Sequence, residues 1–282
     1  MRLAVLTALT MVAFASNSIL TRVAIEGGHI DPSGFAIVRV AAGALVLGMI
    51  ISLRRGGLPL LRRNRIPGAV SLAAYMIGFS LAYLTLDAGL GALILFGVVQ
   101  ITMFAHGALQ GATPSRRQLA GAAAAFAGLL LALWPGPGGE ADPYGAALMV
   151  LAGVAWAAYT IIGRRAADPL AATAANFLLC LPLVLILLAG TARTFSITGV
   201  ALGIVCGGLT SGLGYTLWYK VLPHFDGANA AIVQLSVPII AILAGFVLLG
   251  EPLGLLLVLS AILVVGGIAW AVTAQSAPRD HR

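Results

Sequence analysis

Charged residues are scarce in this sequence, at 9% of its 282 residues. A soluble domain carries about 25%, so this chain has too few charged side chains to cover a folded surface exposed to water. Only two cysteines are present, Cys180 and Cys206, and both lie in apolar runs, which excludes a disulfide-built secreted protein. A soluble two-domain enzyme, which the length alone would allow, is excluded as well. Apolar residue types dominate instead, at 60% of the sequence.

Sequence patterns for catalysis and for nucleotide or nucleic-acid binding are also missing. There is no P-loop motif, and the net charge of +7 comes without a basic helix or a basic surface interleaved with aromatic residues. No Asp or Glu lies deep in an apolar run, and no clustered acids or nucleophile–base pair suggest an active site. We therefore expect no enzyme activity, no cofactor, no metal and no nucleic-acid partner.

Ten apolar runs fill most of the chain. A helix needs about 20 mostly apolar residues to cross a bilayer, and each of these runs approaches or exceeds that length. The first is too long for the h-region of a cleaved signal peptide. We expect an all-α integral membrane protein, a single transmembrane domain over residues 1–282, with ten transmembrane helices near 3–25, 34–52, 66–86, 90–110, 117–134, 144–163, 170–190, 198–219, 228–249 and 252–273.

The loops between these runs alternate in charge. One set holds 13 of the 16 basic residues: Arg2, Arg54, Arg55, Arg62, Arg63, Arg65, Arg116, Arg117, Arg164, Arg165, Lys220, Arg279 and Arg282. The other set holds Arg193 and the acidic residues Glu26, Asp31, Asp87, Glu140, Asp142 and Glu251. Because short loops rich in Lys and Arg stay in the cytoplasm, we expect a multi-pass protein of the cell (inner) membrane with both termini cytoplasmic.

The two halves of the sequence resemble each other. Residues 11–24 align with 153–166, and the Asp-Pro pair at 31–32 with the pair at 168–169. Farther along, Gly78, Tyr83, Gly91 and Ala92 correspond to Gly214, Tyr219, Gly227 and Ala228. A repeat of five spans crosses the membrane an odd number of times, so the second copy enters the membrane with the opposite orientation. Inverted repeats, here 1–135 and 144–275, are typical of secondary transporters; a duplicated bundle without transport is the alternative.

The segment PIIAILAGFVLLGEPL, from Pro238 to Leu253, resembles a signature of the drug/metabolite transporter superfamily, in its ten-span branch of EamA-type metabolite exporters. The first half lacks the matching Pro and Gly-Glu near 103–110. The short motifs at 156–159 (WAAY) and 215–218 (YTLW) are most similar to the aromatic amino-acid exporters of the YddG kind. The resemblance implies a 5+5 inverted repeat, and it places Pro238 beside the pathway.

Polar and aromatic residues inside the spans are the candidates for a transport pathway, because polar groups in a bilayer are costly unless they face protein or water. Helical spacing places Tyr75 with Phe79, Gln100 with Met103, and Trp156 with Tyr159 on shared faces. Packing in the core is the alternative role, and for Trp218 and Tyr219, beside Lys220, we expect the membrane interface. The predicted cavity-lining residues are Asn17, Tyr75, Phe79, Gln100, Met103, Trp156, Tyr159, Asn176, Tyr215, Gln234 and Pro238.

Charged residues near the outer ends of the first two spans form a second candidate group: Arg22, Arg39, Glu26 and Asp31. They are expected to build either a salt-bridge network that holds the two spans together or an outer gate. In the second case Arg39 contacts a substrate carboxylate, for which guanidinium geometry is suited.

These patterns together predict a membrane transporter that exports aromatic and other neutral amino acids, or related small metabolites, by alternating access. The substrate is a small molecule that moves down its own gradient, the other partner is the lipid bilayer, and a monomer suffices because both halves lie in one chain. An exporter of amphipathic drugs or nucleobase-like metabolites is the alternative. An intramembrane enzyme lacks the clustered acids it needs, and a channel lacks a charge ring or a carbonyl filter.

Overall fold

A computed structural model describes residues 2–54, 57–58, 60, 65–111, 115–134, 142–163, 166, 168–225, 230 and 233–273. Within these ranges the chain is helical, and the only bridge between extended residues joins Ile30 to Phe195. Glu140 and most of the arginines of the basic loops lie outside the described residues.

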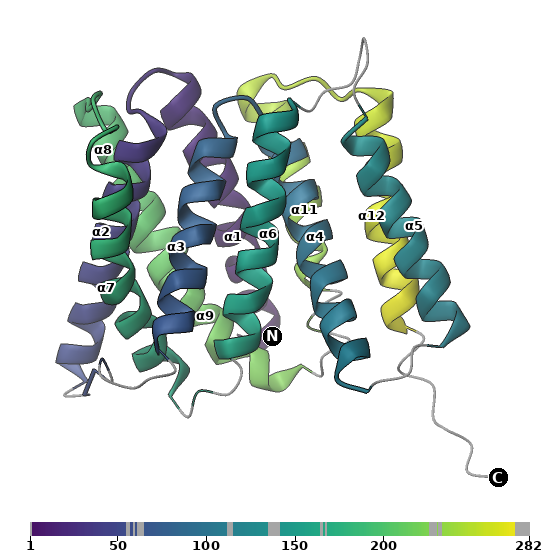
Figure 1. Cartoon of the computed structure of the whole chain (residues 1–282), viewed down its shortest axis with the longest axis horizontal. Helices are drawn as coiled ribbons and strands as arrows, with labels where there is room; N and C mark the ends of the chain where they lie inside the picture. The colour runs from purple at the N-terminus through teal and green to yellow at the C-terminus, as the bar shows by residue number, and fades with distance from the viewer. Residues whose placement is uncertain are drawn as a thin grey trace.

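The helices follow one another with short connections (Figure 1). In chain order they are α1 (Arg2–Glu26), α2 (Pro32–Leu53), α3 (Arg65–Ala82), α4 (Ala88–Leu109), α5 (Arg116–Ala132), α6 (Pro143–Gly163), α7 (Pro169–Leu188), α8 (Ile197–Ile204), the π-helix η1 (Val205–Leu213), α9 (Gly214–Val221), the 3-10 turn η2 (Leu222–His224), α11 (Ser236–Ala244), the π-helix η3 (Gly245–Leu249) and α12 (Leu255–Thr273).

Eight helical segments among the described residues are long and apolar enough to cross a membrane, and the continuous segment 197–224 counts as one of them. Two of the ten expected spans correspond to shorter helices. The expected span 117–134 is α5, with 17 residues. The expected span 228–249 has helical residues at 230, 233 and 234 and a helix over Ser236–Leu249, while 228, 229, 231 and 232 lie outside the described ranges. The structure thus shows an all-helical membrane protein, and the count of ten stays a prediction.

Aspartate–proline pairs start three of the helices. The side chains of Asp31, Asp142 and Asp168 each accept a hydrogen bond from the backbone N–H three residues later, at 2.7, 2.8 and 3.0 Å. The proline that follows lies in the first turn, where no N–H is needed. This capping explains why the sequence located the starts of these helices to within two residues.

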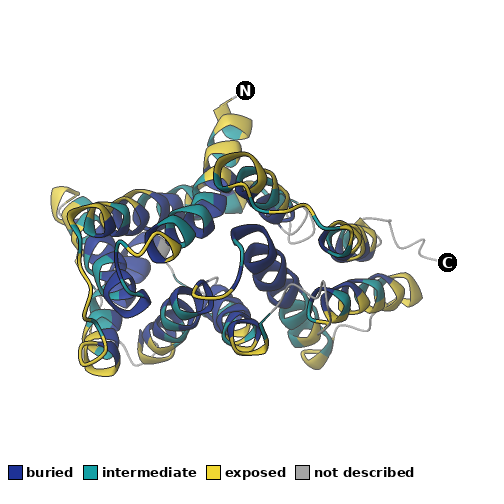
Figure 2. Ribbon diagram, turned by 90° about the horizontal axis from the view of Figure 1, so that it is seen from above, coloured by how far each residue is buried: buried dark blue, intermediate teal, exposed yellow. Residues whose placement is uncertain are grey.

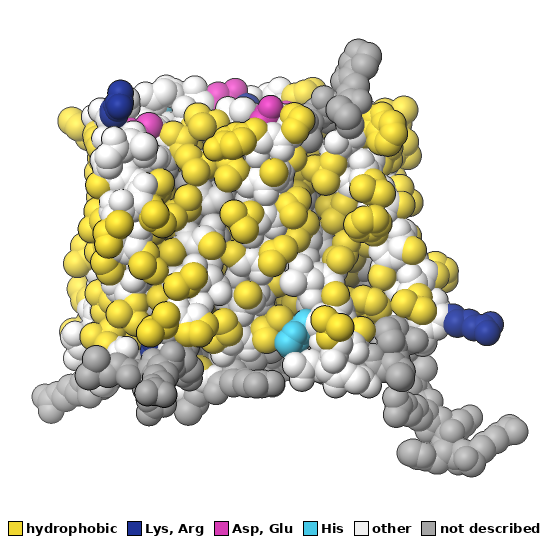
Figure 3. Space-filling model, in the orientation of Figure 1, with side chains coloured by type: hydrophobic (Ala, Val, Ile, Leu, Met, Phe, Trp, Pro, Cys, Tyr) yellow, Lys and Arg dark blue, Asp and Glu magenta, His cyan; other side chains and the backbone are white. Residues whose placement is uncertain are grey.

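Most helices gather around a buried centre, while α5 and α12 pack on each other at one side of the bundle, on the right in Figure 1 (see also Figure 2). Hydrophobic side chains cover the sides of the bundle (Figure 3). Several are largely exposed, including Leu45 at 74% and Ile186 at 80%. Exposed apolar surface on this scale, around helices of bilayer length, is the surface that lipid covers.

The two ends of the bundle differ in charge. The upper end in Figure 1, called here the acidic end, carries Glu26, Asp31, Asp87, Asp142 and Glu251, and Figure 3 shows acidic side chains there. The lower end, called the basic end, carries the described residues Arg2, Arg54, Arg65, Arg116 and Lys220. The helix α1 begins and α12 ends at the basic end (Figure 1).

The segment of α8, η1 and α9 changes from α- to π-helix and back. Three of the six glycines of this segment, Gly207, Gly208 and Gly212, lie in the π-helix η1. Gly207 lies so close to α2 that a Cβ there would collide with the carbonyl oxygen of Arg39. Wide π turns inside α-helices occur frequently at functional sites, and this one faces the buried arginine of α2.

Candidate functional site

A fully buried arginine lies inside the bundle, in the second turn of α2. Arg39 of α2 has none of its surface exposed. Its Nε donates to Ser211 Oγ at 3.1 Å, and its Nη2 donates to Asn17 Oδ1 and to Tyr75 Oη, both at 3.2 Å. Its Nη1 has no hydrogen-bond partner. Among the described residues no carboxylate pairs with this guanidinium. Asn17, Arg39, Tyr75 and Ser211 are called the central polar cluster below.

Asn17 organises this cluster from α1. Its Oδ1 lies 2.8 Å from Thr210 Oγ1 and 3.0 Å from Ser211 Oγ, in addition to the contact with Arg39. The amide oxygen therefore joins α1 to α2 and to the π-helix η1. An amide and two hydroxyls carry no charge, so they leave the positive charge of Arg39 without a counter-ion.

Aromatic rings surround the central polar cluster on its other sides. Trp156 of α6 has ring-centroid distances of 4.8 Å to Tyr75 and 4.9 Å to Tyr215, and Phe14 of α1 lies 5.8 Å from Tyr215. The guanidinium carbon of Arg39 lies 4.8 Å from the ring centroid of Phe79, which is within cation–π range. Phe14, Tyr75, Phe79, Trp156 and Tyr215 form the aromatic cluster.

A cavity of about 10 Å³ remains between the rings and the polar groups, which is room for about one water molecule. Both halves of the chain contribute to its wall, so a larger molecule can enter only if the aromatic side chains move apart. Its lining comprises Phe14, Asn17, Ser18, Tyr75, Phe79, Leu95, Phe96, Trp156 and Tyr215.

Five of the predicted cavity-lining residues meet at this cavity: Asn17, Tyr75, Phe79, Trp156 and Tyr215. Gln100 and Gln234 instead bond to each other, at 3.4 Å between α4 and α11. Met103 is a partly buried residue of α4, and Pro238 is buried in α11; neither lines the cavity.

The remaining two predicted residues, Tyr159 and Asn176, lie towards the basic end. Together with Arg65, the first residue of α3, they form a second buried group, called the basic-end polar cluster. Their exposed fractions are 1%, 2% and 5%. The Tyr159 ring has a centroid distance of 5.6 Å to Trp156, so the basic-end polar cluster adjoins the aromatic cluster.

Arg22 holds the helices together at the acidic end. Its Nε lies 2.9 Å from Glu26 Oε2, its Nη2 lies 3.1 Å from Asp87 Oδ1, and its Nη1 donates to the carbonyl oxygen of Tyr83 at 3.3 Å. Glu251 Oε1 lies farther away, at 3.9 Å from Arg22 Nε. Arg22 and Glu26 therefore form ion pairs at this end, but the pairs connect α1 to the start of α4 and to Glu251. Arg39 and Asp31 are in none of the ion pairs among the described residues, so these pairs do not join α1 to α2 as expected.

Glu251 also caps α4, because its carboxylate accepts hydrogen bonds from the backbone N–H groups of Ala88 at 2.6 Å and Gly89 at 3.2 Å. Burial raises the pKa of this carboxyl above its usual range, although the two backbone hydrogen bonds act in the opposite direction. Asp31, which was expected beside Arg39, instead accepts from the backbone N–H groups of Arg193 and Thr194, at 2.8 and 2.7 Å. Burial raises the pKa of Asp31, but the backbone hydrogen bonds outweigh burial and lower it overall.

Sequence reasoning missed several residues of these sites. Phe14 and Thr210 were not selected, because one is apolar and the other lies among small residues. Arg65 was counted only as a loop charge. Trp218 was expected at the membrane interface, but it is 4% exposed and packs 6.0 Å from Phe14 between ring centroids. The available signal was helical spacing, since Phe14, Asn17 and Ser18 fall on neighbouring faces of α1.

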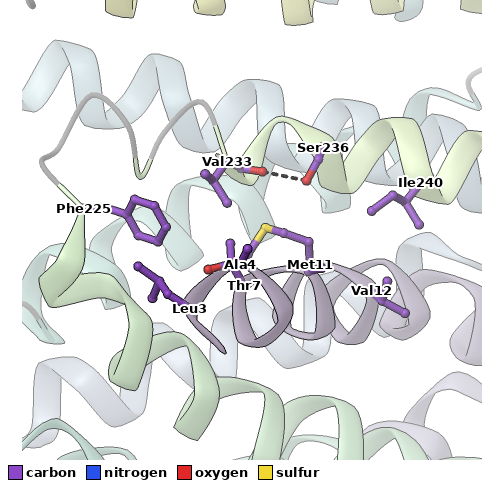
Figure 4. Close-up of a pocket in the computed structure, with 10 residues that line it drawn as sticks. Leu3, Ala4, Thr7, Met11, Val12, Phe225, Val233, Ser236 and Ile240 are labelled. Atoms are coloured by element: carbon purple, nitrogen blue, oxygen red, sulfur yellow. Dashed lines mark hydrogen bonds between the residues drawn. The ribbon is translucent and has the colours of Figure 1, made fainter. Parts of the chain in front are cut away.

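A larger, apolar groove of about 590 Å³ lies between α1 and α11 in the basic half of the bundle (Figure 4). Ser236 donates to the carbonyl oxygen of Val233 at 2.7 Å at its edge. None of the predicted site residues lines it; its wall comprises Leu3, Ala4, Thr7, Ala8, Met11, Val12, Phe225, Val233, Ser236 and Ile240.

Comparison with known proteins places the chain in a family. Residues 143–273 match the model of the EamA-like transporter family. The uncharacterized protein PA1977 of Pseudomonas aeruginosa is 44% identical over 272 residues, which cover 95% of this chain and 93% of that protein. An uncharacterized transporter of Archaeoglobus fulgidus is 25% identical, with 93% and 94% covered.

One solved crystal structure, described only as that of a protein, superposes with a TM-score of 0.70 at 18% identity and covers 98% of both chains. That likeness concerns the fold alone. The chain is therefore a multi-pass membrane protein that carries an EamA-like transporter family domain in residues 143–273 and belongs, over nearly its whole length, to one family with the Pseudomonas aeruginosa relative.

Proposed function

We propose that this protein exports aromatic and other neutral amino acids across the cell (inner) membrane by alternating access. The observation that carries the proposal is the guanidinium of Arg39, which is buried beside the rings of Tyr75 and Phe79 and has no carboxylate partner among the described residues. A buried cation without a counter-ion is costly in a membrane. A substrate carboxylate would supply that counter-ion, and Arg39 Nη1 is free to donate to it.

The aromatic cluster supports an amino acid with a flat or apolar side chain. Trp156, Tyr75 and Tyr215 present ring faces beside the guanidinium, and ring faces stack well on aromatic side chains. A carboxylate on Arg39 and a side chain among the rings together describe an aromatic amino acid. Drugs and nucleobase-like metabolites would use the rings as well, but most of them bring no carboxylate to the arginine.

Helix packing supports two inverted repeats of five spans. α1 packs on η1 and α9, as α6 packs on α3, and α1 packs on α11, as α6 packs on α4. In a five-span repeat, α1 corresponds to α6, α3 to the segment of η1 and α9, and α4 to α11. Each contact made by α1 in one half therefore has an equivalent contact made by α6 in the other. Two such halves can exchange inward-open and outward-open arrangements of similar energy, and the small central cavity corresponds to a state between them.

The positive-inside rule orients the proposed exporter, because the basic end carries most of the arginines. The substrate would then enter from the cytoplasm at the basic end and leave past the Arg22 ion pairs at the acidic end. No carboxylate lies beside the central polar cluster among the described residues, and we propose movement down the substrate's own gradient.

Resistance of cells to a toxic phenylalanine analogue tests this function. Cells that overproduce the protein should survive a dose that kills control cells. Trp156→Ala and Tyr215→Ala should abolish the resistance while the protein remains in the membrane at its normal level. Trp134→Ala is the matched control, because Trp134 is 66% exposed and distant in sequence from the cluster. Resistance that survives both cluster substitutions would contradict the proposed site, and resistance only to drugs without a carboxylate would favour the alternative substrates.

A further inference from the structure

The basic-end polar cluster carries three buried side chains whose hydrogen-bonding atoms lack partners. Arg65 Nε, Tyr159 Oη and Asn176 Oδ1 are each buried and each without a hydrogen bond. The three residues come from three helices, α3, α6 and α7. A buried polar atom without a partner is costly, so three at one place indicate a site that a ligand completes.

Contacts between neighbours place these side chains together. The hydroxyl of Tyr159 lies beside the side chains of Thr173 and Asn176, and the charge of Arg65 is close enough to act on it. The amide of Asn176 packs against Gly68, one turn after Arg65, where an added Cβ would lie 2.9 Å from Asn176 Nδ2. Any side chain larger than glycine at 68 would therefore push the amide out of place.

The chemistry of the unpartnered atoms matches the head group of an α-amino acid. Arg65 Nε is a donor on a cation and suits a carboxylate. Asn176 Oδ1 is an acceptor and suits an ammonium group, while the Tyr159 hydroxyl can serve either. Arg65 takes part in none of the salt bridges among the described residues. The donor–acceptor pair selects a zwitterion over a simple anion or a simple amine.

The position of the basic-end polar cluster suits a site that binds substrate before it reaches the central polar cluster. Arg65 begins α3 at the basic end, and Tyr159 is one turn from the end of α6 at the same end of the bundle. The ring of Tyr159 packs on Trp156, and Trp156 packs on Tyr75, whose hydroxyl accepts from Arg39. A side chain that leaves the basic-end polar cluster thus meets aromatic rings all the way to the central polar cluster.

We propose that Arg65, Tyr159 and Asn176 form a loading site that binds the carboxylate and ammonium groups of an amino acid at the basic end before it moves to Arg39. This inference rests on the proposed function. It adds a second, separate binding site that only substrate arriving from the basic end would use. Removing it should therefore weaken binding from one side of the membrane.

The test uses Tyr159→Phe, Arg65→Gln and Asn176→Leu in sided membrane vesicles with radiolabelled phenylalanine. Each variant should raise the KM measured from the basic end, in inside-out vesicles, by about tenfold, and should leave the KM from the acidic end unchanged. Tyr159→Phe is the sharpest variant, because it removes only a hydroxyl whose contacts with Thr173 and Asn176 fall short of hydrogen-bond geometry, so the empty protein should lose little stability. Arg54→Gln is the matched control, since Arg54 is an exposed arginine at the same end of the bundle.

Competition with fragments of the substrate adds a second readout. In the wild type, unlabelled phenylalanine should inhibit uptake of radiolabelled phenylalanine from the basic end better than 3-phenylpropionate or 2-phenylethylamine does. In Asn176→Leu, phenylalanine and 3-phenylpropionate should inhibit this uptake equally well. Equal KM changes from both ends, or no change in stable variants, would overturn the loading site and leave the proposed function intact. A wild type that moves no phenylalanine in either direction would overturn both.

Discussion

Arg39→Met separates a functional arginine from a structural one. An arginine inside a membrane-spanning helix costs up to about 3 kcal/mol, and its unpartnered Nη1 costs about 1–3 kcal/mol more. Its three hydrogen bonds, at 3.1–3.2 Å, are longer than strong charge-assisted ones and return about 1.5 kcal/mol each. These contributions nearly cancel. Methionine occupies a similar length and needs no partner, so we expect the free energy of unfolding to change by less than about 2 kcal/mol.

Transport should respond very differently to the same substitution. Removing one partner of a buried, hydrogen-bonded charge pair costs about 3 kcal/mol, which is roughly a hundredfold in kcat/KM. The assay pairs thermal unfolding in detergent with phenylalanine flux in liposomes. Arg39→Lys is the companion variant: it keeps the charge but loses the planar fork, and should retain part of the flux.

A strongly destabilised Arg39→Met protein would refute this reasoning. A loss of 3–5 kcal/mol, typical of a buried charge pair that has been broken, would mean that the arginine holds the bundle together. Normal flux in a stable Arg39→Met protein would also refute the reasoning, because the guanidinium would then have no role in substrate binding.

Three further predictions concern the ends of the bundle and its packing. Asp31→Asn should lower stability near neutral pH. Hydrogen bonds from the backbone of Gly34, Thr194 and Arg193 lower the pKa of Asp31, so its contribution to stability is present above its ordinary pKa of 3.8 and is lost as pH falls through the lowered value. Melting curves measured at several pH values would detect this loss. Burial raises the pKa of Glu251 above 4.5, so the stability of the wild type should fall as pH rises through the raised pKa. Glu251→Gln should remove this fall. A variant with the same pH profile of stability as the wild type would contradict the prediction. Gly207→Ala should destabilise by about 1–3 kcal/mol because its Cβ meets the Arg39 carbonyl oxygen, whereas Gly48→Ala, which meets nothing within 4 Å, should be neutral or slightly stabilising in the same melting assay.

The helices were largely predictable because their signals are local. The expected span 34–52 became Pro32–Leu53, and 144–163 became Pro143–Gly163, since hydrophobic length and Asp-Pro capping both act within a few residues. The π-helical turns of η1 and η3 were not predictable. Within η1, Gly207 packs closely on Arg39 of α2, and such a contact between distant segments leaves no periodic pattern in the sequence.

The candidate site was predictable in its residue types but not in its pairings. Tyr75, Trp156 and Tyr215 were selected as intramembrane aromatics, and they meet at one cavity. The partners of Arg39 were expected among Glu26 and Asp31, which are near in sequence, yet its bonds reach Ser211, 172 positions away. Asp31 instead binds residues 193 and 194, because capping α2 and fixing that loop already use its oxygens.

Counterflow of phenylalanine in liposomes tests the central claim most directly. Purified protein is reconstituted with unlabelled phenylalanine inside, and uptake of radiolabelled phenylalanine is followed without any imposed ion gradient. We predict a transient, saturable accumulation that Trp156→Ala and Arg39→Met abolish. Absence of counterflow in the wild type, or flux that never saturates, would contradict an alternating-access exporter of amino acids.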